Sequence, residues 1–149
     1  MSDPFKDVAE FHRKFGLEYE GKPRALPRAL QAFRDKFHRE ELREYGVATQ
    51  RLARLLAKQE EASIDDEVAL ELSHALDALV DEMYVLLGTA YLHGFDFNAA
   101  WDRVHAANMA KVRAQRAADS KRKSRFDVVK PPGWQPPRIQ PLVSDHAHQ

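Results

Sequence analysis

The sequence of 149 residues contains no cysteine. This absence excludes disulfides, thiolate metal sites and a cysteine nucleophile, and it fits a reducing compartment. The chain also has no net charge, with 23 Lys and Arg against 23 Asp and Glu residues, so no overall positive field favours nucleic-acid binding. The charged N-terminus lacks an apolar secretory core, and the longest apolar run is interrupted by carboxylates. We therefore expect a cytoplasmic protein with no membrane partner.

No stretch alternates polar and apolar residues for long enough to form a sheet, so we expect an all-α fold. Apolar residues instead recur at helical spacing in four segments, residues 4–15, 27–62, 66–93 and 96–117. Five of the eight prolines lie in the last 23 residues, which should be extended or irregular. We predict an antiparallel helical bundle in one domain, residues 1–120, followed by a basic and then proline-rich extension, residues 121–149.

The third segment is apolar nearly all round between Leu76 and Leu92. A helix of this kind needs burial on every side. Four helices from one chain of this length are too few to bury this helix on every side. We therefore expect a homo-oligomer in which this helix lies at the subunit contact.

Two acidic clusters stand on neighbouring predicted helices. Glu40, Glu41 and Glu44 form the pattern E-E-x-x-E, whose spacing places all three on one side of a helix. Asp77 and Asp81 are one helical turn apart inside the apolar third segment, where an ionised carboxylate is costly to bury. Facing helices would bring about five carboxylates together, and divalent cations would relieve their repulsion. Ligands that are all oxygen suit Mg²⁺ or Mn²⁺.

Two other interpretations of these acids stay open. The stretch "REELRE" by itself is what a solvated helix face looks like. The aspartates could instead pair with Arg34 or Arg103 in a structural ion pair. We also regard Arg34 as a candidate for substrate binding.

Several motifs occur together in one order: E-E-x-x-E, "ALVDEMYVLLGTAYLHGFD", "VHAANMAKV" and "KPPGW". In this the chain resembles the MazG-like all-α nucleoside triphosphate pyrophosphohydrolases, in particular small single-domain forms from bacteriophages and some bacteria. The similarity spans residues 11–134. It implies Mg²⁺-dependent hydrolysis of a nucleoside or deoxynucleoside triphosphate to the monophosphate and pyrophosphate. It also implies a dimer or dimer of dimers that controls the nucleotide pool, in the host cytoplasm if the chain is phage-encoded.

The resemblance also assigns roles to residues. It makes Glu41 and Glu44 metal ligands, and Glu40 a ligand or the base that orients the attacking water. The family's second cluster reads E-x-x-D, but here the glutamate position holds Ala78, ahead of Asp81; neighbouring Asp77 is the candidate substitute. The family has an Asn and a Lys that reach the nucleotide phosphates, here Asn108 and Lys111. Judged by residue type, further candidates for substrate binding are Arg113, Lys130 and Trp134 in a tail that could fold over the site or onto a partner, and His12 for the base. A solvated basic end of the last helix and core packing of the phenylalanines beside His12 stay open as alternatives.

Two rival functions follow from other patterns. Glu71-x-x-His74, nearly repeated as Asp102-x-x-His105, has the spacing used by di-iron helical bundles. Residues 111–125 carry seven basic residues against one Asp, which would suit a nucleic-acid-binding module. Aromatic residues are not interleaved with that run, and the acidic middle of the chain would repel a polyanion. Nucleic acid is therefore not expected as a partner.

Overall fold

The structure is a computed structural model that describes residue 1 and residues 3–58 and 65–144. It forms two compact units, Met1–Gly94 and Phe95–Gln149. The first contains the helices α1 (Pro4–Lys14), α2 (Arg28–Leu56) and α3 (Asp66–Leu92). The second contains helix α4 (Phe97–Met109), strands β1 (Val112–Arg113) and β2 (Val128–Val129), and the short 3₁₀ turns η1 (Ala117–Asp119) and η2 (Gln140–Leu142).

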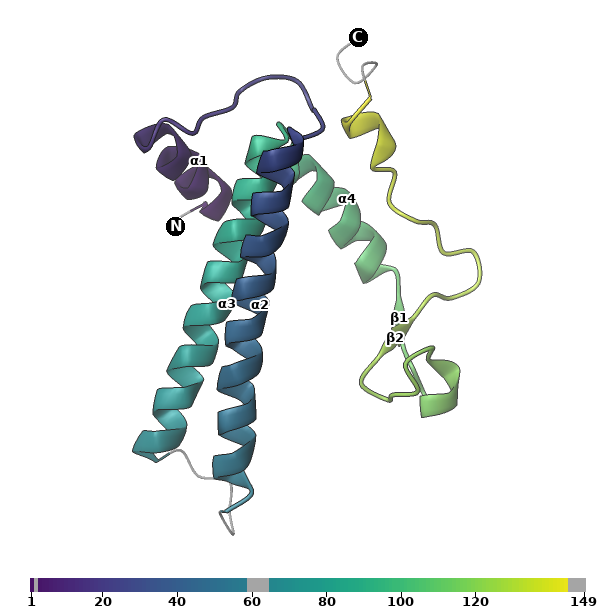
Figure 1. Cartoon of the computed structure of the whole chain (residues 1–149). Helices are drawn as coiled ribbons and strands as arrows, with labels where there is room; N and C mark the ends of the chain where they lie inside the picture. The colour runs from purple at the N-terminus through teal and green to yellow at the C-terminus, as the bar shows by residue number, and fades with distance from the viewer. Residues whose placement is uncertain (2, 59–64, 145–149) are drawn as a thin grey trace. The chain divides into compact units, whose positions relative to one another are not determined.

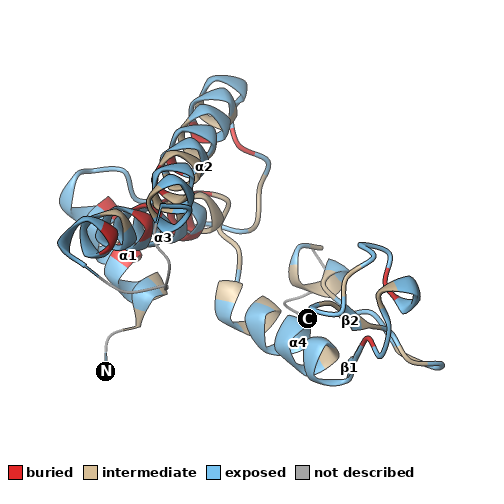
Figure 2. Ribbon diagram, turned by 90° about the horizontal axis from the view of Figure 1, so that it is seen from below, coloured by how far each residue is buried: buried red, intermediate tan, exposed pale blue. Residues whose placement is uncertain are grey.

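Helices α2 and α3 run side by side in opposite directions and form the body of the first unit (Figure 1). The buried residues of α3 recur three or seven positions apart over much of its length, which places Ala75, Ala78 and Val85 on one stripe. Small side chains on this stripe, together with buried Ala48 of α2, allow the two helices to approach closely. Figure 2 shows the buried positions where α1, α2 and α3 meet.

The far end of α3 anchors α1 and the segment that follows it. Leu26, Tyr91 and Leu92 form a small core, against which Phe5 of α1 and Leu30 of α2 pack. Backbone groups of the linker also bind this end. The amide of Tyr19 donates to the Tyr91 hydroxyl at 3.2 Å, and the amide of Arg24 donates to the His93 carbonyl at 2.9 Å.

The mostly helical class predicted from the sequence is confirmed, and several helix boundaries agree with it. Asp65 caps α3 by accepting a hydrogen bond from the amide of Val68 at 2.9 Å, and Asp96 caps α4 through the amide of Ala99 at 3.0 Å. Helix α2 continues through Gly46, as its apolar spacing indicated. The last residues of the predicted second helix, 59–62, lie outside the described residues.

Two expectations require correction. Helix α4 ends at Met109, not near residue 117, and the chain then forms a two-stranded antiparallel sheet that pairs Val112 with Val129. Asp77 and Asp81 are exposed, because they lie off the stripe that faces α2. The apolar side of α3 is exposed in the single chain, with Leu76 at 64%, as it must be if a second copy is to cover it.

Two expectations are not tested by these observations and stay predictions. They are the homo-oligomer formed through α3 and the domain boundary at residue 120. Within the described residues, no helix is both long enough and apolar enough to cross a membrane.

Candidate active site

The acidic residues of α2 and α3 gather around Glu41. This carboxyl is only 9% exposed, since it lies on the side of α2 that faces α3. Burial raises its pKa, and the negative charges of Glu44, Asp81, Glu40 and Asp77 raise it further. The two acidic clusters therefore act on one another electrostatically across the helix pair.

These five residues fit a divalent cation by their chemistry. All their donors are carboxylate oxygens, the ligands that Mg²⁺ and Mn²⁺ prefer. The pKa of Glu41 is raised by burial first and then by the charges of the other acids, and a bound cation would offset both effects. Among the residues described, no three carboxylate or imidazole groups are already placed to hold one ion. Shared ligation would draw the side chains closer together than they lie here.

A cavity of about 230 Å³ opens beside Glu41 and Asp81, and it lies wholly within the first unit. Its apolar walls come from α1, α2 and α3, with Phe11 and Tyr84 in edge-to-face contact at a centroid distance of 5.4 Å. Flat aromatic walls favour a planar ring such as a nucleobase. The cavity is lined by Phe11, His12, Arg34, Phe37, Glu41, Asp81, Tyr84 and Val85.

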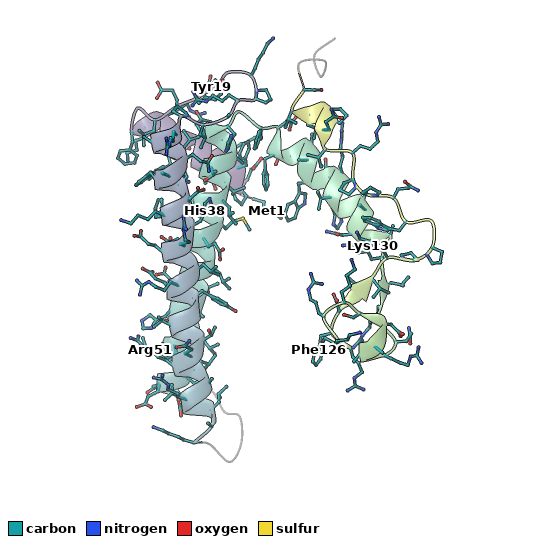
Figure 3. All side chains as sticks on the ribbon, turned by 45° about the vertical axis from the view of Figure 1, so that its right-hand side comes forward. Met1, Tyr19, His38, Arg51, Phe126 and Lys130 are labelled. Atoms are coloured by element: carbon teal, nitrogen blue, oxygen red, sulfur yellow. The ribbon has the colours of Figure 1, made fainter. Side chains whose placement is uncertain are left out.

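Arg34 brings a buried positive charge to the same cavity. Its Nε donates to the Thr89 hydroxyl at 2.9 Å, and its Nη2 donates to the Val85 carbonyl at 2.5 Å. The Thr89 hydroxyl donates to that same carbonyl at 2.9 Å, so it accepts from Nε2–H of His38, which lies 2.9 Å away. His38 is labelled among the side chains of the first unit in Figure 3. No ion pair is found for Arg34 among the described residues. A fixed guanidinium without a carboxylate partner is suited to bind a phosphate.

His12 forms the other polar wall. Its ring is buried and tilts against Tyr91 at a centroid distance of 5.0 Å, and its Nδ1 has no hydrogen-bond partner among the described residues. Burial lowers the pKa of His12, so the ring is neutral at pH 7. The neutral ring complements a neutral base better than a second cation would.

The side chains of His12 and Arg34 both pack against Gly88, which has no Cβ, so a substitution at Gly88 tests this packing. A Cβ at Gly88 would lie 2.8 Å from Nε2 of His12 and 2.9 Å from Nη2 of Arg34, so Gly88→Ala should displace both side chains. We expect a loss of about 1–3 kcal/mol in the free energy of unfolding. Gly46→Ala is the matched control: a Cβ at Gly46 meets nothing within 4 Å, so it should stabilise α2 by about 0.5–1 kcal/mol. Urea melts measure both, and equal effects would contradict this packing.

The remaining substrate-binding candidates lie in the second unit, where they cluster. The ammonium of Lys111 donates to Oδ1 of Asn108 at 2.8 Å, and Lys111 and Lys130 both lie over the ring of Trp134. Arg113 is exposed on β1. Trp134 donates from its indole nitrogen to the Ala107 carbonyl at 2.7 Å, so the "KPPGW" segment folds back onto α4.

Of the alternative pairings named from the sequence, the one with Arg34 does not form within the described residues. Arg34 bonds to Thr89 and Val85 and forms no ion pair with Asp77 or Asp81. Arg103 belongs to the second unit, where it donates to the carbonyl of Arg138 at 2.5 Å, and its pairing with either aspartate stays a prediction. Of the proposed iron ligands, Glu71 and His74 contact each other at 3.3 Å on the surface of α3.

A comparison with protein families shows which family the chain belongs to. The family model described as phosphoribosyl-ATP pyrophosphohydrolase matches residues 8–108, which include the whole acidic cluster and the aromatic cavity. The chain belongs to the phosphoribosyl-ATP pyrophosphohydrolase family. This family is part of the MazG-like all-α nucleoside triphosphate pyrophosphohydrolase superfamily, so the resemblance seen in the motifs is confirmed at that coarser level.

Membership of the phosphoribosyl-ATP pyrophosphohydrolase family indicates a hydrolase that acts on phosphoric anhydrides, with a nucleotide as substrate. No curated protein matches the chain. The matched residues end at Asn108, so the β1–β2 region and the proline-rich segment fall outside the family model.

The raised pKa of Glu41 predicts a pH dependence of stability. Because its pKa is raised in the folded protein, Glu41 binds its proton more tightly there than in the unfolded chain. Without metal, the free energy of unfolding therefore falls as the pH rises from the ordinary pKa of a glutamate through the raised pKa of Glu41. Glu41→Gln should therefore be more stable than the native chain near neutral pH in EDTA, and this advantage should shrink towards about pH 4. Thermal melts of both proteins measure it. An advantage that grows on acidification would contradict the assigned environment.

Some residues of the site were missed by the sequence reasoning. Phe37, Tyr84, Val85, Thr89 and His38 were assigned no role, although helical spacing places Tyr84 and Val85 one turn beyond Asp81. That spacing was the available signal. The hydrogen bonds that join Thr89 to Arg34 and His38 form only when α2 packs against α3. The sequence of either helix alone does not indicate them.

Proposed function

We propose that this chain is a Mg²⁺-dependent pyrophosphohydrolase that cleaves a nucleoside or deoxynucleoside triphosphate to the monophosphate and pyrophosphate. The observation that supports it best is the buried Glu41 carboxyl, whose pKa is raised by acids on both α2 and α3, beside an aromatic cavity. We further propose that it is of the small single-domain MazG-like type and acts on the nucleotide pool.

In this proposal the cavity binds the nucleotide and orients it. Phe11, Phe37 and Tyr84 would enclose the base, and Arg34 would hold a phosphate oxygen close to Glu41 and Asp81. The oxygen of a water molecule bonds to the α-phosphorus while the bond to the bridging oxygen of pyrophosphate breaks. Glu40, which is exposed and lies 3.8 Å from Lys36, would accept the proton of that water.

The carboxylates of Glu41, Glu44, Asp77 and Asp81 would hold the cations. Bound Mg²⁺ supplies positive charge that offsets the phosphate oxygens and acidifies water. Glu41 would be the central ligand of this set, because each of the other acids contributes to its raised pKa. Its protonation at acidic pH would compete with metal binding.

We also propose that a second copy of the chain covers the exposed side of α3. Leu76, Val80 and Met83 are between 43% and 64% exposed there, a contiguous apolar surface of the kind that marks an interface. Sedimentation of the native chain and of Val80→Glu would test it. A monomeric native chain at micromolar concentration would rule this contact out.

A substrate screen tests the proposed reaction. Each canonical ribo- and deoxyribonucleoside triphosphate, and phosphoribosyl-ATP, would be incubated with Mg²⁺, with Mn²⁺ and with EDTA, and the products identified by chromatography. The proposal requires a monophosphate and pyrophosphate from a triphosphate, with a divalent cation present. If phosphoribosyl-ATP is hydrolysed and no triphosphate is, the proposed substrate is wrong. If orthophosphate is released in place of pyrophosphate, the proposed reaction is wrong.

A further inference from the structure

Two cavities follow one another along the interface between α2 and α3. The aromatic cavity includes Glu41 and Asp81, and a second cavity of about 260 Å³ includes Glu44 and Asp77. Glu41 and Glu44 lie one helical turn apart on α2, and Asp81 and Asp77 lie one turn apart on α3. The acidic cluster therefore lies at the junction of the two cavities, and both belong to the first unit.

The second cavity differs from the first in its walls. Arg43 and Arg51 line it from α2, and His74 lines it from α3. Among the described residues, no Phe, Tyr or Trp contributes to its wall, so it is poorly suited to a nucleobase. Two guanidinium groups, each with several N–H donors, suit a compact anion with many oxygens.

The two arginines are available to such an anion. Both are exposed, and neither forms an ion pair among the described residues. Helical side chains lean towards the N-terminus of their helix, so Arg51 reaches back towards Glu44, which is about 10 Å away along the axis. Figure 3 shows Arg51 farther along α2 than His38. The charge of Arg51 is therefore directed towards a group that extends from the acidic cluster into the cavity.

The wall from α3 leaves space for this group. Buried Ala78 lines the cavity between the two arms of the acidic cluster, at the position that holds glutamate in the resembled pattern. A glutamate there would take up part of the space and add a negative charge. Nδ1 of His74 lies 3.3 Å from Oε2 of Glu71, so this pair, considered for iron from the sequence, forms part of the cavity end beyond Asp77.

We propose that the second cavity binds the pyrophosphate end of the substrate, and that Arg43 and Arg51 are specificity-determining residues for it. This rests on the proposed function, in which the base lies in the aromatic cavity and the α-phosphate at the acidic cluster. When the bond to the α-phosphorus breaks, its electron pair stays on the bridging oxygen of the leaving pyrophosphate. Negative charge then grows on the side of the second cavity, where the guanidinium groups offset it.

The positions of the arginines predict a preference for triphosphates over diphosphates. With the α-phosphate at the acidic cluster, a triphosphate places two further phosphates in the second cavity and a diphosphate places one. Arg51 is farther along α2 from Glu41 than Arg43 is, so it contacts the terminal phosphate. Arg51→Gln should therefore lower kcat/KM for a triphosphate about tenfold and leave that for the corresponding diphosphate unchanged.

Calorimetric titration of the full chain with sodium pyrophosphate in excess Mg²⁺ measures the second cavity without turnover. The native chain should bind pyrophosphate saturably, and Arg51→Gln should bind it about tenfold more weakly, the effect of losing one charge-assisted hydrogen bond. Arg54→Gln is the matched control with native affinity, because it removes the same charge from the next turn of α2 without lining the cavity. Thermal melts establish that both variants are folded.

Three results would overturn the proposal. They are no saturable binding of pyrophosphate to the native chain, equal affinities of Arg51→Gln and Arg54→Gln, and weakening by Lys111→Gln while Arg51→Gln binds normally. The last would place pyrophosphate on the second unit. Selective weakening by Arg51→Gln in a chain that hydrolyses no triphosphate would support the cavity and contradict the proposed hydrolysis, so the two failures are distinguishable.

Discussion

Glu41→Gln should reduce triphosphate turnover at least about a hundredfold while leaving the protein folded. The substitution keeps the volume of the side chain and removes its charge at the centre of the acidic cluster. A divalent cation contributes several kcal/mol of charge stabilisation in such reactions, and each 1.36 kcal/mol corresponds to a tenfold change in rate. Loss of the central ligand is therefore costly, even though four other carboxylates remain.

The measurement is initial rate against Mg²⁺ concentration, with a thermal melt in EDTA to establish that the variant is folded. Glu67→Gln is the control, since it removes one exposed carboxylate from the first turn of α3, about 15 Å along the axis from Asp77. That control should keep native turnover. Native rates in Glu41→Gln would show that the cluster does not hold the reacting metal.

Asp77→Asn should lower turnover by roughly ten- to a hundredfold, an effect of the size seen when groups around a metal are altered. The position that holds glutamate in the resembled E-x-x-D pattern is here Ala78, which is 4% exposed on the side of α3 facing α2. Asp77 lies beside it and lines a cavity with Glu44 and His74, so its carboxylate is available on the correct side of the cluster.

Asp81→Asn is the comparison variant, measured with Asp77→Asn at saturating and at limiting Mg²⁺. Both should shift the Mg²⁺ dependence to higher concentration if both aspartates are ligands. Full activity in Asp77→Asn together with a large loss in Asp81→Asn would contradict the role of Asp77. Asp81 would then be the metal ligand from α3, and Asp77 would not replace the glutamate that is missing at position 78.

The parts of the fold that could be predicted from the sequence depend on local interactions. Helix starts at Asp65 and Asp96 follow from side chains that bind amides three residues away, and the spacing of Glu41 and Glu44 follows from helix geometry. The β1–β2 pairing joins Val112 to Val129 across 17 positions, which no local pattern indicates. For that reason α4 was expected to continue past Met109.

The same reasoning explains why the site was only partly predicted. Arg34, His12, Glu41 and Asp81 were candidates by residue type, and the structure places them around one cavity. The exposure of Asp77 and Asp81 was missed, because an apolar helix suggests burial on every side, whereas α3 presents only one stripe to α2. The aromatic walls come from three helices, so their meeting is set by tertiary packing.

The central claim is that α2 and α3 share divalent cations next to the aromatic cavity. Anomalous diffraction from crystals grown with Mn²⁺ and a non-hydrolysable triphosphate analogue tests it most directly. The account predicts manganese density in contact with Glu41 and Asp81, with the phosphates reaching the same ions. Crystals in which the analogue is bound but manganese is absent from these carboxylates, or lies elsewhere on the chain, would contradict it.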